Sequence, residues 1–87
     1  MNIKFNRQFL KHFKKRIPPR SKLDAKFESR LDLWMNDPKN PILSDHRLAG
    51  KKRDFRSFSI TGDIRVIYKI EDDTVWFYDV GSHNQVY

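Results

Sequence analysis

Residues 56–70 read Arg-Ser-Phe-Ser-Ile-Thr-Gly-Asp-Ile-Arg-Val-Ile-Tyr-Lys-Ile, and they carry the clearest secondary-structure pattern in the chain. Apolar residues alternate with small polar ones before Thr61-Gly62-Asp63 and recur at every second position after it. A period of two is the pattern of a strand with one buried face. We therefore predict two antiparallel strands joined by a tight turn, in which Gly62 takes a positive φ.

The residues that follow predict a third strand. Thr74 to Val80 is rich in aromatic and β-branched residues and comes after the acidic turn at 71–73. The three strands would form an antiparallel meander. Arg56 and Arg65 interrupt its apolar strands at positions where packing alone would favour Val or Thr, so both are candidate functional residues.

The residues before this stretch predict a short edge strand at 2–5 and two amphipathic helices. Asn6 is a good N-cap for a helix over 7–17, and Pro18-Pro19 ends that helix. Ser21 caps a second helix, which ends at 36–38. The expected fold is α+β, in the order β-α-α-β-β-β, with a helical hairpin packed on a mainly antiparallel sheet.

Residues 38–54 are expected to form an irregular loop, because Pro38, Pro41 and Gly50 break any periodic pattern. A polar loop of this length in so small a domain is often functional. It contains His46 and the basic run Lys51-Lys52-Arg53, which is either a solvated face or a place to hold phosphates.

Composition limits the class of protein. Eighty-seven residues predict one domain over 1–87. The chain has no cysteine, no long apolar run and no signal-peptide pattern, which favours a cytoplasmic protein away from membranes. Its formal charge is +7, and residues 1–30 hold ten of the basic side chains against two acids. An excess of this kind points to a polyanionic or acidic partner, or merely to a well-solvated surface.

Familiar catalytic motifs are absent from the sequence. It has no glycine-rich phosphate loop, no His-Glu-x-x-His and no nucleophile elbow around a serine. Potential metal ligands are few and scattered. We therefore expect neither a cofactor nor a metal site.

Cleavage of RNA needs less machinery, because the substrate supplies its own nucleophile, the 2′-OH. Histidine suits the two proton transfers, which makes His46 and His83 the candidates. Arginine suits the charge on the phosphate, which makes Arg56 and Arg65 the candidates. Tyr87 could stack on an unpaired base.

Each candidate also has a structural interpretation. His46 could be a loop residue bonded to the backbone, and Asp63 could be simple turn chemistry. His83 follows a Gly-Ser turn near the chain end, where packing demands little. His12, on the first helix, is expected to be exposed.

Several segments resemble the RelE/ParE superfamily of toxins from toxin–antitoxin modules. These segments are Leu48-Ala-Gly, Phe55-Arg-Ser-Phe, Gly62-Asp-Ile-Arg-Val-Ile-Tyr-Lys-Ile70 and Val80-Gly-Ser-His83. The motifs Asp45-His46-x-Leu48-x-Gly50 and Gly81-Ser82-His83 are similar to the YafQ branch, whose members are ribosome-dependent mRNA endonucleases. The resemblance implies functional roles for His46, Asp63, His83 and Tyr87. It also implies mRNA on the ribosome, ribosomal RNA and an acidic antitoxin as partners.

One position departs from the YafQ pattern. Ser59 stands where that branch has a further histidine on the strand before the turn, so one proton-transfer or phosphate contact is missing. Two other readings stay open. ParE proteins share the fold but poison DNA gyrase, although their C-terminal segment generally lacks a Gly-x-His ending. A degenerate member of the superfamily would only bind its antitoxin.

Overall fold

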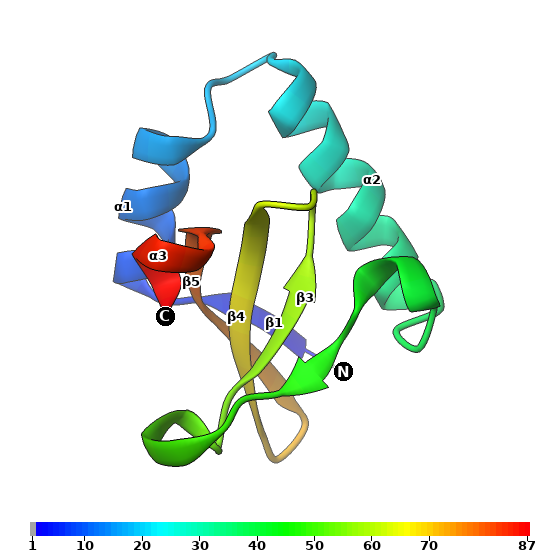
Figure 1. Cartoon of the computed structure of the whole chain (residues 1–87), viewed down its shortest axis with the longest axis vertical. Coiled ribbons are helices and arrows are strands. Elements are labelled where there is room, and N and C mark those ends of the chain that lie inside the picture. Colours follow the sequence, from blue (N-terminus) through cyan, green and yellow to red (C-terminus); the bar gives the residue numbers. More distant parts are fainter. Residues whose placement is uncertain (1) are drawn as a thin grey trace.

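Five strands form a single sheet in the order β1-β5-β4-β3-β2 in the computed structural model, which describes residues 2–87 (Figure 1). The strands are β1 Asn2–Phe5, β2 His46–Arg47, β3 Arg56–Ser59, β4 Ile64–Glu71 and β5 Thr74–Ser82. Neighbouring strands are antiparallel except β1, which runs parallel to β5 at the edge. The predicted α+β class with a mainly antiparallel sheet is confirmed.

Two long helices precede the meander, and their starts agree with the prediction. In α1, Arg7–Arg16, the Asn6 side chain accepts a hydrogen bond from Phe9 N at 2.7 Å. In α2, Lys22–Asn36, the Ser21 hydroxyl accepts one from Asp24 N at 3.1 Å. Figure 1 shows the helices running in opposite directions and diverging from the loop that joins them.

Aromatic side chains fill the core between these helices and one face of the sheet. The Trp34 ring stacks on Phe58 with centroids 5.3 Å apart and meets Tyr68 edge-on at 5.1 Å. Phe13 and Phe27 join the two helices, with ring centroids 4.8 Å apart. The two helices of the predicted hairpin therefore contact each other through aromatic rings near the loop that joins them. Each helix also packs on the sheet.

The segment over 38–54 is more ordered than the sequence predicts. It contains 3₁₀ turns at Pro41–Leu43 and Gly50–Lys52, with β2 between them. Leu43 is fully buried in the core, and β2 pairs with the edge of β3. An edge strand offers unpaired backbone groups, so two residues of a neighbouring loop can add to it without any periodic pattern of their own.

The turn between β3 and β4 forms as predicted, but by another means. Gly62 does not adopt the positive φ expected of it; Gly50 is the glycine with a positive φ among the described residues. Instead the Thr61 hydroxyl accepts hydrogen bonds from Asp63 N at 3.2 Å and Ile64 N at 3.0 Å. A side chain that mimics a backbone turn removes the need for a left-handed residue.

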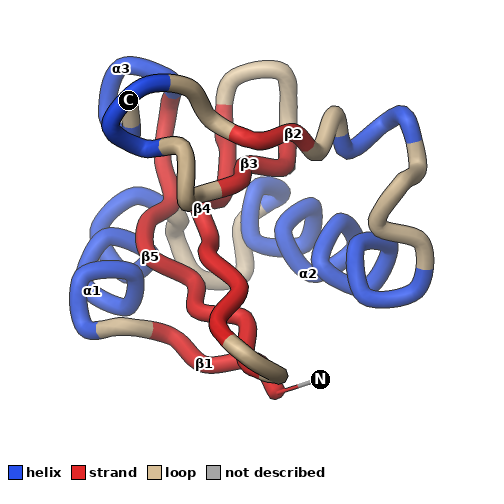
Figure 2. Tube along the Cα trace, turned by 90° about the horizontal axis from the view of Figure 1, so that it is seen from below, coloured by secondary structure: helices blue, strands red, loops and turns tan. Residues whose placement is uncertain are grey.

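The chain ends in a short helix, α3 His83–Val86, and Gly81-Ser82, where the sequence predicted a turn, are instead the last residues of β5. In Figure 2 the strands run between α2 on one side and α3 on the other. Val86 of α3 and Ile67 of β4 are buried but do not belong to the main core cluster. The sheet therefore has a helical core on one face and a small second layer on the other, and this second face carries the candidate site.

Candidate active site

The second face of the sheet presents the polar positions of β3 and β4. Ser57 lies opposite Ile67 in the strand register, and Ser59 lies opposite Arg65. Residues directly opposite in an antiparallel pair share a face, and alternate residues along each strand do the same. Ser57, Ser59 and Arg65 therefore lie on the face away from Phe58 and the core.

His46 joins this face through β2. Its register partner is Ser57, so the two side chains share one face of the sheet. The imidazole is exposed, and its Nδ1 lies 2.8 Å from the carbonyl oxygen of Ser44. A carbonyl oxygen can only accept, so Nδ1 carries the proton in this contact and Nε2 is left as the acceptor of the neutral ring.

His83 and Tyr87 come to the same place from the chain end. They are one helical turn apart, and their rings meet edge-on with centroids 4.5 Å apart. The Tyr87 hydroxyl donates to Ser57 Oγ at 2.8 Å. Ser57 is thus the strand neighbour of His46, and it is hydrogen-bonded to the hydroxyl of Tyr87, whose ring contacts His83. Both histidines are exposed, as groups that exchange protons with a substrate must be.

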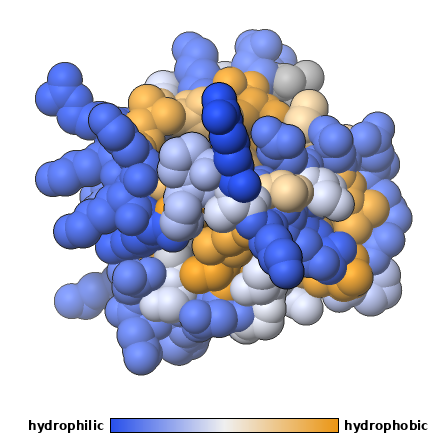
Figure 3. All heavy atoms as spheres, turned by 90° about the horizontal axis from the view of Figure 1, so that it is seen from above, coloured by the Kyte–Doolittle hydropathy of each residue, from blue (hydrophilic) through white to orange (hydrophobic). Residues whose placement is uncertain are grey.

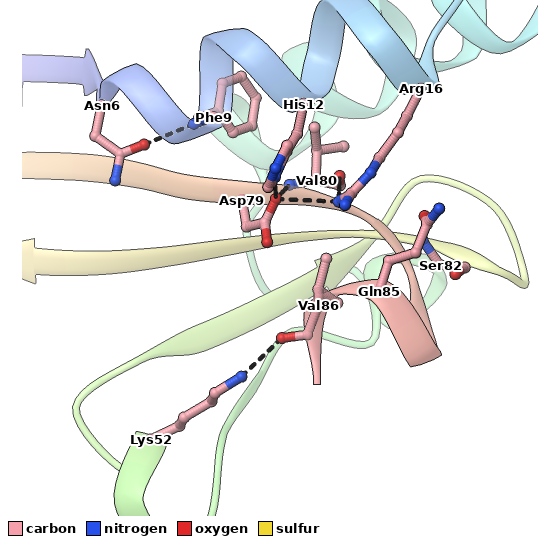
Figure 4. A network of polar contacts seen from close by, with 10 residues as sticks. All are labelled: Asn6, Phe9, His12, Arg16, Lys52, Asp79, Val80, Ser82, Gln85 and Val86. Carbon is pink, nitrogen blue, oxygen red and sulfur yellow. Dashed lines mark hydrogen bonds and ion pairs between the residues drawn. The ribbon is translucent and has the colours of Figure 1, made fainter.

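The position of α3 is held by contacts from three segments (Figure 4). Gln85 Oε1 accepts from Ser82 N at 2.8 Å, which caps the helix start. Lys52 Nζ donates to the Val86 carbonyl at 2.8 Å, which ties the basic loop to the helix end. A Cβ added to Gly81 would lie 2.7 Å from Arg16 Nη1, so α1 also packs closely against the strand leading into α3.

The basic loop and the hairpin acid lie at opposite ends of α3. Lys51 and Arg53 are exposed beside Lys52, and Arg47 Nε donates to the Arg53 carbonyl at 2.8 Å. Asp63 is exposed after the turn, at the start of α3. It lines a cavity of about 510 Å³ whose other lining residues are Lys15, Arg16, Ile64, Ser82 and Gln85.

Arg56 does not join the other candidates. Its register partner is Tyr68, which places it on the core face, and its guanidinium contacts Asp45 at 2.8 Å. Asp45 also accepts from Trp34 Nε1 at 2.9 Å and from the Tyr68 hydroxyl. The sequence contained the signal for this difference between the two arginines. Arg56 is two residues before Phe58 in β3, so both face the core, whereas Arg65 is next to the core residue Val66 in β4 and faces the other way.

The cluster of Asp45, Arg56 and Tyr68 shifts the ionisation of two of its members. Burial of Tyr68, together with its hydrogen bond to Asp45 and the charge of that carboxylate, raises the pKa of the phenol to about 12. Burial lowers the pKa of Arg56, but its hydrogen bonds to Tyr68 and Asp45 and the attraction of Asp45 outweigh this and raise it overall.

Alkaline pH should therefore weaken the fold through Tyr68. The pKa of the phenol is higher in the folded chain than its ordinary value of 10.0, so folding favours the protonated form. This stabilisation is present below pH 10 and is lost as pH rises toward about 12. Urea unfolding across this range should show a falling free energy of unfolding. Tyr68→Phe should flatten that fall, whereas Tyr78→Phe, which leaves the Tyr68–Asp45 bond in place, should keep it.

His12 is not the exposed residue that the sequence suggested. Its Nδ1 lies 2.6 Å from Oδ1 of the buried Asp79, and Arg16 Nη1 lies 3.3 Å from the same oxygen (Figure 4). Arg16 Nη1 also donates to the Val80 carbonyl at 2.9 Å. The i, i+4 spacing of His12 and Arg16, opposite an acid in an apolar strand, was the available signal.

Neither a metal cluster nor a membrane span is found among residues 2–87. The structure places no three His, Asp or Glu side chains where they could share a metal ion. None of its helices is both long enough and apolar enough to cross a bilayer.

Comparisons with known proteins agree with this architecture. YafQ from E. coli is 23% identical, with 99% of this chain and 97% of that chain covered and a TM-score of 0.82. The E. coli DinJ-YafQ complex matches with the same identity and coverage and a TM-score of 0.79. A copper-bound mutant toxin from Helicobacter pylori is 28% identical over 100% of this chain and 99% of that chain, with a TM-score of 0.81. No curated protein sequence matches the chain.

The family match carries more weight than these likenesses, since the two E. coli structures, at 23% identity, establish the fold alone. The family described as the bacterial toxin of a type II toxin-antitoxin system, YafQ, matches residues 1–87. The chain belongs to the YafQ family of toxins from type II toxin–antitoxin systems.

Proposed function

We propose that this toxin cleaves mRNA on the translating ribosome by attack of the substrate's own 2′-OH. The observation that carries the proposal is the meeting of His46, Ser57, Tyr87 and His83, from three segments of the chain, on the sheet face opposite the core. Two exposed histidines held at one place can take one proton and give another, which is what this reaction needs.

The geometry favours one division of labour. His46 Nε2 accepts the proton of the 2′-OH, because Nδ1 is engaged with the Ser44 carbonyl. His83 protonates the departing 5′-oxygen. Tyr87 keeps about 40% of its surface exposed while its hydroxyl is bound to Ser57, so its ring can stack on a base. Asp63 and the loop at 51–53 would lie on either side of the bound RNA strand.

The ribosome supplies what so small a site lacks. Bringing the 2′-OH and the phosphate into line is worth several kcal/mol when the geometry is imposed in advance. Eighty-seven residues offer little surface for holding a flexible strand, whereas mRNA in the decoding site is already held. Hydrophilic side chains extend from the side of the molecule where α1 lies (Figure 3). That helix carries five of the 18 Lys and Arg residues of the chain, which suits docking on ribosomal RNA in the cytoplasm.

We also propose that an acidic antitoxin neutralises this chain. E. coli YafQ has been solved in a complex with DinJ, and the +7 charge of this chain suits an acidic counterpart. The antitoxin would cover the basic surface and exclude the ribosome.

Primer extension on a defined message tests the cleavage. Wild-type protein in a reconstituted translation system should cut the translated message and leave a 2′,3′-cyclic or 3′-phosphate end. Free RNA should remain largely intact, and chelator should not stop cleavage while the ribosomes hold together. Inhibition of gyrase supercoiling with an uncut message would assign the chain a ParE-like activity instead.

Arg65→Ala should separate activity from stability. No side-chain hydrogen bond or ion pair joins Arg65 to any other residue in the 2–87 range, so its removal leaves the fold close to wild type. In this proposal the guanidinium stabilises the negative charge that develops on the phosphate. Removing one such donor typically slows a reaction about 10²–10³-fold. The check is the cleavage rate beside a thermal melt. Wild-type cleavage by the folded variant would remove Arg65 from the site.

A further inference from the structure

A second cavity with an unusual lining lies at the C-terminal end of β3, beyond the residues that pair with β2. It has a volume of about 540 Å³ and opens between the first half of α2, the turn after β3 and the segment before His46. Its lining residues are Lys26, Arg30, Ile42, Ser44, Ser59, Ile60, Thr61, Gly62 and Arg65. The lining thus combines three cationic side chains with three hydroxyl groups, and no carboxylate is among it.

Two of the three cations in this cavity, Lys26 and Arg65, have no side-chain hydrogen-bond partner among the described residues. Arg65 Nε is the buried side-chain polar atom without a hydrogen-bond partner among residues 2–87. Lys26 likewise forms no side-chain hydrogen bond or ion pair with any residue that the structure describes. A buried polar group left unpaired is unfavourable, and native proteins usually retain one only for a reason.

Arg30 is held at the wall of the cavity. Its Nε donates to the Ile60 carbonyl at 3.4 Å, which directs the guanidinium along the end of β3. The terminal N–H groups of the same guanidinium are then presented as a fork, the shape that matches a phosphate. Like charges lining one cavity repel one another, and an anion between them relieves this repulsion.

The cavity adjoins the candidate active site. The carbonyl of its Ser44 holds the His46 imidazole, and its Ser59 lies two residues from Ser57 on the same face of β3. Two residues along a strand span about 7 Å. An RNA strand that meets the histidines would therefore pass the cavity within its next nucleotides.

We propose that Lys26 and Arg30 form a binding site for a phosphodiester of the RNA strand, beside the reacting phosphate that Arg65 contacts from the same cavity. This inference deepens the proposed function and rests on it for the identity of the strand. The ligand is a phosphodiester because the lining offers charged and hydroxyl donors without a flat apolar wall for a base. The pocket governs affinity, while the histidines govern the reaction.

The experiment compares Lys26→Gln/Arg30→Gln with Lys4→Gln/Lys39→Gln, which removes the same charge from exposed positions outside the cavity, α1 and the basic loop. The first probe is a fluorescent single-stranded RNA with 2′-O-methyl groups, which binds but is not cut. We expect the pocket variant to bind it about tenfold more weakly and the control to change little. The slope of log affinity against log salt should fall by roughly 0.7–1, as for one lost phosphate.

A second probe, vacant ribosomes, identifies the source of the phosphodiester. Weaker binding to the oligonucleotide assigns it to mRNA, and weaker binding to vacant ribosomes alone assigns it to ribosomal RNA. Equal affinity of pocket variant and control for both probes overturns the proposal. Binding is measured without cleavage, so a wild type that binds through the pocket but never cuts would refute the proposed function and leave the pocket standing. Lys26→Gln alone repeats the test should the double variant melt early, and Lys26→Arg should restore affinity.

Discussion

His83→Ala should abolish cleavage of a translated message while the protein still melts near the wild-type temperature. Its imidazole is exposed and meets the Tyr87 ring edge-on, so little packing is lost. The reaction loses the group that protonates the leaving 5′-oxygen. Removing a positioned acid typically slows a reaction about 10²–10⁴-fold.

Asn84→Ala is the matched control for this prediction. Asn84 is the next residue of α3, is equally exposed and contributes no hydrogen bond from its side chain within residues 2–87. Both variants would be assayed by primer extension over a series of times and by thermal melting. Cleavage by His83→Ala at the rate of Asn84→Ala would show that another group supplies the proton.

Asp45→Ala should cause the largest loss of stability. The carboxylate is only 8% exposed and accepts from Trp34 Nε1, the Arg56 guanidinium and the Tyr68 hydroxyl. Its removal leaves these three donors facing a methyl group, which cannot accept a hydrogen bond. We expect a loss of about 3 kcal/mol, because breaking a buried ion pair is costly, although Arg56 partly reaches water.

Such a loss is a large part of the roughly 5–15 kcal/mol that holds a small domain folded. It would lower the melting temperature by about 12–24 °C for a chain of this size. Asp32→Ala, which removes an exposed acid from α2, should change it little. A melting temperature of Asp45→Ala within a few degrees of the control would show that water satisfies the three donors.

The two arginines that stood out in the sequence should therefore fail in different ways. Arg56→Ala should lower the melting temperature, because Arg56 pairs with Asp45 on the core face. Arg65→Ala should lower activity, because Arg65 lies on the other face with an unpaired Nε. Alternation within each strand carried this information.

Much of the fold could be predicted because its signals are local. Alternation over 56–70 and the caps at Asn6 and Ser21 act between residues that are neighbours in the chain, and the structure confirms each. A local signal gave a wrong prediction where more than one backbone geometry can close the same turn. Gly62 suggested a left-handed turn, but the nearby Thr61 hydroxyl closes the turn instead.

The strand meander, the two capped helices and the family can be inferred from the sequence, since periodicity, capping and motif order are properties of neighbouring residues in the chain. Which candidate residues meet depends on the tertiary structure. His46 reaches Ser57 because two loop residues pair with a sheet edge, and Tyr87 reaches it because α3 folds back over the second face. These contacts join residues 11 and 30 positions apart through strand register and side-chain packing. Register and packing minimise free energy over the whole molecule, so no window of sequence contains them.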